Sequence, residues 1–195
     1  MKKLSTIIII LLVLVGCGSK SVLKPNKEGL VAPSFFEIIE SNNYSIKISS
    51  NDPFSGDLVI SADVGENKGS TSLENDDEKT SFILNENMFY IVAYDQKTIY
   101  KTETEEQDDM NFINLDFSDY KFIEKGKELF NEVERDFETY EIHNENIKFY
   151  FDKNELLAFS TETDFGTSTA EILELDNKPN PKAFELPKDF EIIEQ

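Results

Sequence analysis

Polar turn residues recur along most of the chain, and between them apolar and polar side chains alternate one by one. Residues 44–48 show this alternation, and residues 58–64 repeat it. Turn-forming clusters rich in Asn, Asp and Glu follow at 75–78 and 85–87, roughly ten residues apart. A period of two buries one face of a strand, and tight turns join antiparallel neighbours. The pattern therefore predicts a mainly β protein of the α+β class, built on an antiparallel meander.

Two short stretches have helical spacing instead. Ser34 and Glu37 have the spacing of a capping box, and apolar residues behind them predict a helix at about 34–42. A second helix is predicted at about 105–115, where apolar residues recur at helical spacing. Residues 88–94 are apolar on both faces and predict a central strand that is covered on both sides. The predicted helix is a candidate for covering the second face of that strand.

Residues 120–142 fit two different structures. Their apolar side chains fall at the spacing of one helix face, namely Phe130, Val133, Phe137 and Tyr140. The same stretch also fits two strands that meet at Asn131 and Glu132, and Gly126 is poorly placed in a helix interior. Periodicity alone favours neither structure.

The first seventeen residues have the layout of a secretory signal peptide. Lys2 and Lys3 precede an aliphatic run, which is too short to span a bilayer and ends at Gly16-Cys17. The string Leu14-Val15-Gly16-Cys17 resembles the bacterial lipobox, in which the cysteine receives fatty acyl chains such as palmitate and becomes the first mature residue.

This resemblance divides the chain into three parts and predicts where the protein resides. Residues 1–16 are a lipoprotein signal peptide, residues 17–32 a flexible tether after the acylated Cys17, and residues 33–195 a single domain. We therefore expect a lipid-anchored protein on the outward-facing side of the cell membrane. Several acyl chains anchor a protein firmly, whereas one chain does so only marginally.

The charge of the chain narrows its possible partners. It holds 39 acidic and 19 basic side chains and has a net charge of −20. Such a protein is repelled by phosphate backbones, which excludes nucleic-acid binding, and the same repulsion leaves membrane attachment to the lipid anchor. The 16 phenylalanines and seven tyrosines indicate a folded, β-rich body rather than a disordered chain.

The residues give little support to enzymatic or metal chemistry. Cys17 is the only cysteine and His143 the only histidine, so no zinc site can be built from these residue types. His143 begins a polar run that predicts a hairpin turn, and no Gly-x-Ser-x-Gly string accompanies it. The acidic clusters lack the spacing of a calcium loop. We therefore predict a protein without catalytic residues, metal or cofactor.

The strands of the chain contain aromatic and aliphatic residues that are candidates for lining an apolar cavity. They are Phe82, Leu84, Phe89, Ile91, Phe149 and Phe151. Each of them is also typical of an ordinary core, and the sequence does not say which face of the sheet each occupies.

The second half of the chain resembles the LolA/LolB-like lipoprotein-carrier fold, which also includes LppX/LprG lipoproteins and RseB-type regulators. The resemblance lies in Gly126-Lys127-Glu128, Tyr140-Glu141, the strand at 149–151 followed by Asp152, and the closing string at 184–190. It implies that residues 120–142 form a hairpin. It also implies a strongly curved, unclosed half-barrel whose apolar concave face is partly plugged by helices.

Members of that superfamily hold acyl chains or lipidated molecules in the concavity. The resemblance therefore implies a non-enzymatic envelope lipoprotein that binds a lipid or an acyl chain. The alternative is an interaction or sensor module whose acidic surface binds an unknown protein or a glycan, with the barrel filled by its own side chains.

Overall fold

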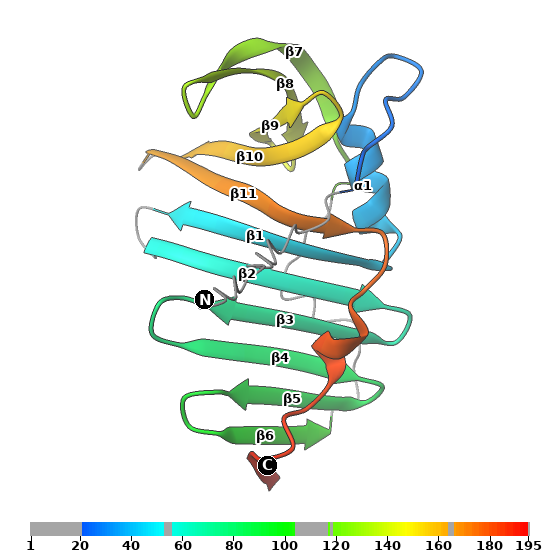
Figure 1. Ribbon diagram of the computed structural model, residues 1–195. Helices are drawn as coiled ribbons and strands as arrows, with labels where there is room; N and C mark the ends of the chain where they lie inside the picture. The colour runs from blue at the N-terminus through cyan, green and yellow to red at the C-terminus, as the bar shows by residue number, and fades with distance from the viewer. Residues whose placement is uncertain (1–20, 53–55, 104–116, 118, 164–165, 195) are drawn as a thin grey trace, which may run out of the picture.

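The computed structural model describes residues 21–52, 56–103, 117, 119–163 and 166–194 (Figure 1). The elements in chain order are α1 (Ala32–Glu40), β1 (Tyr44–Asp52), β2 (Gly56–Gly65), β3 (Lys68–Glu74), β4 (Lys79–Asn85), β5 (Met88–Ala93), β6 (Thr98–Glu103), β7 (Lys121–Phe130), β8 (Val133–Ile142), β9 (Glu145–Asp152), β10 (Glu155–Thr163), β11 (Gly166–Asp176), the 3-10 helix η1 (Pro181–Phe184) and β12 (Glu191–Glu194). Among the described residues, no helix is long and apolar enough to cross a bilayer.

All twelve strands of the described residues belong to one open, curved sheet. Their order across it is β12-β6-β5-β4-β3-β2-β1-β11-β10-β9-β8-β7. Neighbours are antiparallel except β12 and β6, which run parallel. Strand β1 lies in the middle and pairs with β2 on one side and with β11 on the other (Figure 1). The predicted fold class, a curved antiparallel meander of half-barrel form with a short N-terminal helix, is confirmed.

Helix α1 covers one face of the sheet, which we call the inner face. Phe35 and Phe36 are fully buried in a core cluster that draws on β1, β2 and β8–β11. Figure 1 shows the helix beside this half of the sheet and away from β3–β6. The main hydrophobic core therefore lies under α1, at one end of the sheet.

The start of α1 differs from the prediction. The helix begins at Ala32, with Val31 as N-cap and without a side-chain cap from its own segment, so the capping box from Ser34 does not form. The backbone N–H groups of Val31 and Ala32 instead donate to the two carboxylate oxygens of Glu138 in β8, over 2.7 and 3.0 Å. A distant carboxylate therefore supplies the acceptors that a helix start needs.

Residues 21–31, which the sequence predicted as part of a flexible tether, lie against the domain. Leu23 and Val31 are buried in the core cluster. The backbone N–H of Ser21 donates to the carbonyl of Leu175, and that of Leu23 donates to the carbonyl of Asn154. Leu23, Leu30 and Val31 thus gain burial by packing, whereas Val22 stays exposed.

Residues 120–142 form the hairpin β7–β8. Asn131 and Glu132 both have positive φ angles, 49° and 64°, as a two-residue hairpin turn with the twist of the sheet requires. Gly126 opposes Phe137, whose ring lies 3.0 Å from the place where a Cβ of residue 126 would be. His143 and Asn144 form the next turn, with φ angles of 51° and 68°, which confirms the predicted turn at His143.

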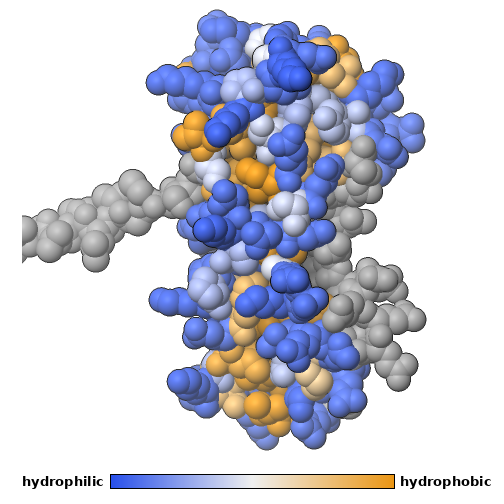
Figure 2. All heavy atoms as spheres, turned by 90° about the vertical axis from the view of Figure 1, so that its right-hand side faces the viewer, coloured by the Kyte–Doolittle hydropathy of each residue, from blue (hydrophilic) through white to orange (hydrophobic). Residues whose placement is uncertain are grey.

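The C-terminal segment crosses the other, outer face of β2–β6 near one end of these strands (Figure 1). Leu186 and Phe190 pack against a small buried cluster of Ile83, Val92 and Ile99. Strand β5 is therefore covered on its outer face by this segment, while the predicted helix at 105–115 lies outside the described residues. Seen from the side, the surface is mostly hydrophilic, with apolar patches at the end that the strands β4–β6 form and in the upper half of the molecule (Figure 2).

Candidate ligand-binding face

The inner face of β2–β6 carries no charged side chain at the described positions of these strands. No bulge interrupts their pairing, so residues that oppose each other in the ladder share a face. The inner positions are Leu58, Ile60, Ala62, Val64, Gly69, Thr71, Leu73, Thr80, Phe82, Leu84, Phe89, Ile91, Ala93, Thr98, Tyr100 and Thr102. The charged residues of the same strands all take outer positions, namely Asp57, Asp63, Lys68, Glu74, Lys79, Lys101 and Glu103.

Four of the six residues predicted to line a cavity come together on this face. Phe82 opposes Ile91, and Leu84 opposes Phe89, across the β4–β5 ladder. The Phe82 and Phe89 rings are stacked with centroids 6.4 Å apart and an interplanar angle of 12°. All four side chains are half-buried. They form an aromatic and aliphatic patch near the middle of the charge-free face.

Phe149 and Phe151, the other two predicted residues, belong to the core under α1. Their exposed fractions are 0% and 1%. The Phe149 ring contacts Phe35 and Phe36 of the helix, with centroids 6.1 and 5.3 Å apart. These two side chains are therefore core, the ordinary alternative that the sequence left open. Cys17, the predicted lipidation site, lies outside the described residues.

The core under α1 closes the charge-free face at one end. Ala62 belongs to that core, and Ile60 and Val64 pack against it. Tyr140 is fully buried there and donates from its hydroxyl to Oε2 of Glu138 over 2.8 Å. Burial, together with this hydrogen bond, raises the pKa of the Tyr140 hydroxyl. The Tyr140 hydroxyl and the Glu138 carboxylate are thus paired with each other in this core.

Residues beyond the predicted set extend the same face. Leu58, Leu73 and Tyr100 lie on it and are half-buried. The alternation in β2 and β3 is the signal that could have identified Leu58 and Leu73. In chemical terms the face offers apolar and aromatic contact with a few threonine hydroxyls, which suits a hydrophobic ligand. Among the described residues, no group of acidic, histidine or cysteine side chains is placed to hold a metal ion.

The sequence matches no family model and no curated protein. Solved structures resemble the fold at low identity. An uncharacterized conserved protein from Thermus thermophilus is 10% identical with a TM-score of 0.49, and the match covers 85% of this chain and 100% of that one. LprF from Mycobacterium bovis is 9% identical with a TM-score of 0.41, over 81% of this chain and 98% of that one.

A chain of the Pseudomonas aeruginosa MucA/MucB complex is similar in the same way. It is 8% identical with a TM-score of 0.44, and the match covers 81% of this chain but only 60% of that one. Likenesses of this size concern the course of the backbone and say nothing of function.

Proposed function

We propose that this protein binds a hydrophobic ligand, such as a lipid or an acyl chain, on the inner face of β2–β6. The observation that supports this function is the separation of charge within these strands: seven charged side chains take the outer face and none of the described positions on the inner face is charged. In a chain with 30% charged residues, five neighbouring strands do not exclude charge from one face unless that face meets apolar groups.

The free energy that apolar contact with the inner face can contribute depends on how many methylenes of a fatty chain it covers. Each methylene that leaves water contributes about 0.8 kcal/mol, so six methylenes against this face contribute about 5 kcal/mol. A gain of about 5 kcal/mol corresponds to a dissociation constant of about 0.2 mM. Ordering of the ligand weakens this further, so tight binding of a fatty chain requires more than six methylenes on this face. The role needs no bond making or breaking, and we propose a binding protein rather than an enzyme.

The proposal includes attachment to the outer side of the cell membrane through acylated Cys17. The lipobox string is its support in the sequence. Since Ser21 is already bonded to β11, only four peptide units separate Cys17 from the folded domain. They span at most about 14 Å. The domain would therefore sit directly on the membrane, where a lipid can reach it without crossing much water.

Native mass spectrometry of residues 21–195, with analysis of an organic-solvent extract, tests the binding role. We expect a co-purified lipid in constant stoichiometry, or uptake of a fluorescent fatty acid. A clean apo mass without uptake would contradict the proposal and favour a filled barrel with a protein or glycan partner.

A pair of variants tests the location of the ligand. Leu84→Gln places an amide on the inner face, and Met88→Gln places one on the outer face of the adjacent strand, where Met88 is half-buried as well. A buried amide without a partner costs about 1–3 kcal/mol, so we expect Leu84→Gln to weaken binding about fivefold or more. Equal binding by the two variants would show that the ligand does not lie on the inner face.

A further inference from the structure

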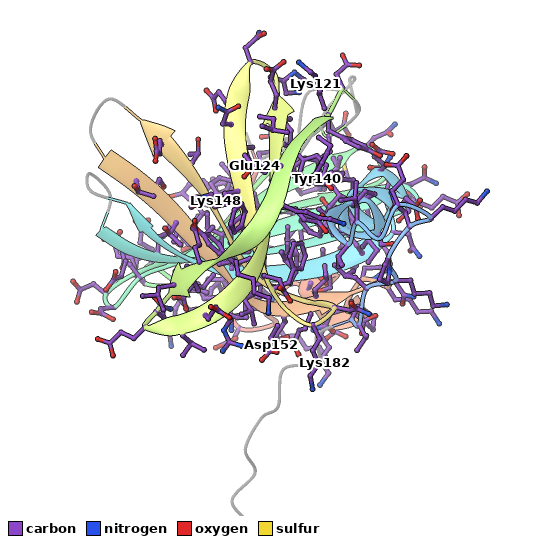
Figure 3. All side chains as sticks on the ribbon, turned by 90° about the horizontal axis from the view of Figure 1, so that it is seen from above. Lys121, Glu124, Tyr140, Lys148, Asp152 and Lys182 are labelled. Carbon is purple, nitrogen blue, oxygen red and sulfur yellow. The ribbon has the colours of Figure 1, made fainter. Side chains whose placement is uncertain are left out.

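The other end of the sheet has a polar hollow on the outer face. Its volume is about 830 Å³, within the range of small-molecule sites, and it is formed by β7–β11 and the turn that precedes β9. In Figure 3, Glu124 and Lys148 lie on one side of β7, and Tyr140 lies on the other side, toward α1. The hollow and the charge-free face therefore belong to opposite faces and to opposite halves of the sheet.

Glu128 and its two hydrogen-bond partners, Lys148 and Tyr150, form one wall of the hollow. Lys148 donates to Oε2 of Glu128 over 2.8 Å, and the Tyr150 hydroxyl donates to Oε1 of Glu128 over 2.7 Å. The Lys148 ammonium also lies 4.7 Å from the centre of the Phe137 ring. Burial acts to raise the pKa of Glu128, but the two hydrogen bonds outweigh it and hold that pKa below its ordinary value. Lysine and glutamate in this wall thus neutralise each other.

Thr139 lines the hollow with an unsatisfied hydroxyl. Its exposed fraction is 7%, and Oγ1 has no hydrogen-bond partner within the described part of the chain. The residue lies in the ladder between Glu124 of β7 and Lys148 of β9. An unpaired buried hydroxyl costs about 1–3 kcal/mol, which a ligand or a water molecule in the hollow recovers by completing its hydrogen bonding.

The remaining charges of the hollow are negative. Glu124, Glu145 and Glu162 line it and are exposed, and Lys148 is already paired with Glu128. Carboxylates around a concave wall focus a negative potential, which repels anions and attracts cations. Among the described residues, no three carboxylates approach closely enough to hold a metal ion. The charges therefore suit a ligand that distributes its positive charge over several ångströms.

We propose that this hollow binds a small organic cation with more than one ammonium group, of the polyamine class. Glu124 and Glu162 would pair with separate ammonium groups, and the Thr139 hydroxyl would accept a hydrogen bond from an N–H of the ligand. The hydroxyl of Ser160, which opposes Lys148 in the ladder, adds a further acceptor along the same wall. The site does not depend on the apolar face, so either one can exist without the other.

Isothermal titration of the mature chain with spermidine, in a non-ionic detergent at low salt, tests the proposal. Two charge-matched double variants are compared, because an acidic protein also adsorbs polyamines nonspecifically. One is Glu124→Gln with Glu162→Gln; the control is Asp76→Asn with Asp77→Asn, in the exposed turn between β3 and β4. We expect the first to lower the affinity at least tenfold and the control to change it less than twofold. Equal losses would reduce the binding to general attraction and overturn the proposal.

Thr139→Val tests the contact with the hydroxyl. Valine has nearly the same shape, so we expect a thermal midpoint equal to or above that of the unaltered chain, together with a threefold to tenfold weaker affinity for spermidine. Unchanged affinity would remove Thr139 from the site and overturn the placement of the ligand. Maltotriose, a neutral polyol of similar size, should not bind; binding as strong as that of spermidine would overturn the assignment to cations.

Discussion

The carboxylate of Glu138 should determine whether α1 stays on the sheet. Its exposed fraction is 4%, and it accepts three hydrogen bonds: from the backbone N–H groups of Val31 and Ala32 and from the hydroxyl of Tyr140. Glu138→Ala removes all three at once. It leaves two helix-terminal N–H groups and a phenol without an acceptor, in a region that excludes most water.

The expected loss can be worked from these contacts. Each buried donor left without a partner costs about 1–3 kcal/mol, and water that enters the space of the missing side chain recovers part of this. Three such donors, partly rehydrated, give an expected loss of about 3–5 kcal/mol. Since the free energy of unfolding of a domain is only about 5–15 kcal/mol, this loss is a large fraction of the total stability. For a chain of this size it corresponds to a fall of about 10 °C in the thermal midpoint.

Urea and thermal unfolding followed by far-UV circular dichroism measure the loss. Glu134→Ala is the matched control, because Glu134 lies in the same strand, has a 69% exposed side chain and is 3.9 Å from Lys127. An exposed pair of that kind contributes less than about 1 kcal/mol. If Glu138→Ala unfolds within about 1 kcal/mol of Glu134→Ala, the carboxylate does not hold the helix and the reasoning fails.

Three further changes have defined outcomes. Cys17→Ala should leave the precursor unacylated and unprocessed, and continued incorporation of labelled fatty acid would refute the lipobox interpretation. Asp63 accepts a hydrogen bond from the backbone N–H of Asn180 over 2.6 Å and should anchor the C-terminal segment. Asp63→Ala should therefore speed proteolysis of that segment about tenfold, which is the equivalent of one hydrogen bond. The control variant Asp57→Ala, at an exposed position of the same strand, should not. The folded pKa of Glu128 lies below its ordinary value of 4.5, so its contribution to stability is present above pH 4.5 and is lost as the pH falls through the folded pKa. The unaltered chain should therefore be more stable than Glu128→Gln at neutral pH and equally stable in acid. A stability difference that persists at about pH 2, well below the ordinary pKa of a carboxyl group, would contradict the pairing.

The strands could be predicted from the sequence because their signal is local. Alternation at 44–48 and 58–64 depends only on one face being buried, and both stretches are strands. The start of α1 is harder to predict than the strands, because the acceptor for its first N–H groups comes from Glu138, 107 residues away. In the β7–β8 hairpin the apolar spacing suits a helix equally well. The feature that decides for a hairpin is the positive φ at Asn131 and Glu132, and a glutamate does not signal a positive φ in the way that a glycine does.

The candidate site shows the same limit. Phe82 and Phe149 follow the same alternating pattern, yet one lies on the charge-free face and the other in the core under α1. The difference depends on which strands the helix covers, and this is a tertiary relation that periodicity does not contain. The unsatisfied hydroxyl of Thr139 is likewise invisible in the sequence, because it depends on what three neighbouring strands place around one atom.

The sheet order has a consequence for how the chain folds and for what happens when it is cut short. The strands β1–β6 can form a meander from local contacts, but that meander has two open edges, at β1 and at β6. Both are closed by the last stretch of the chain: β11 pairs with β1, and β12 pairs with β6. Until residues 166–194 arrive, each intermediate exposes two strand edges that can pair with another molecule. A chain that is truncated before β11 should therefore polymerise through these edges rather than merely unfold.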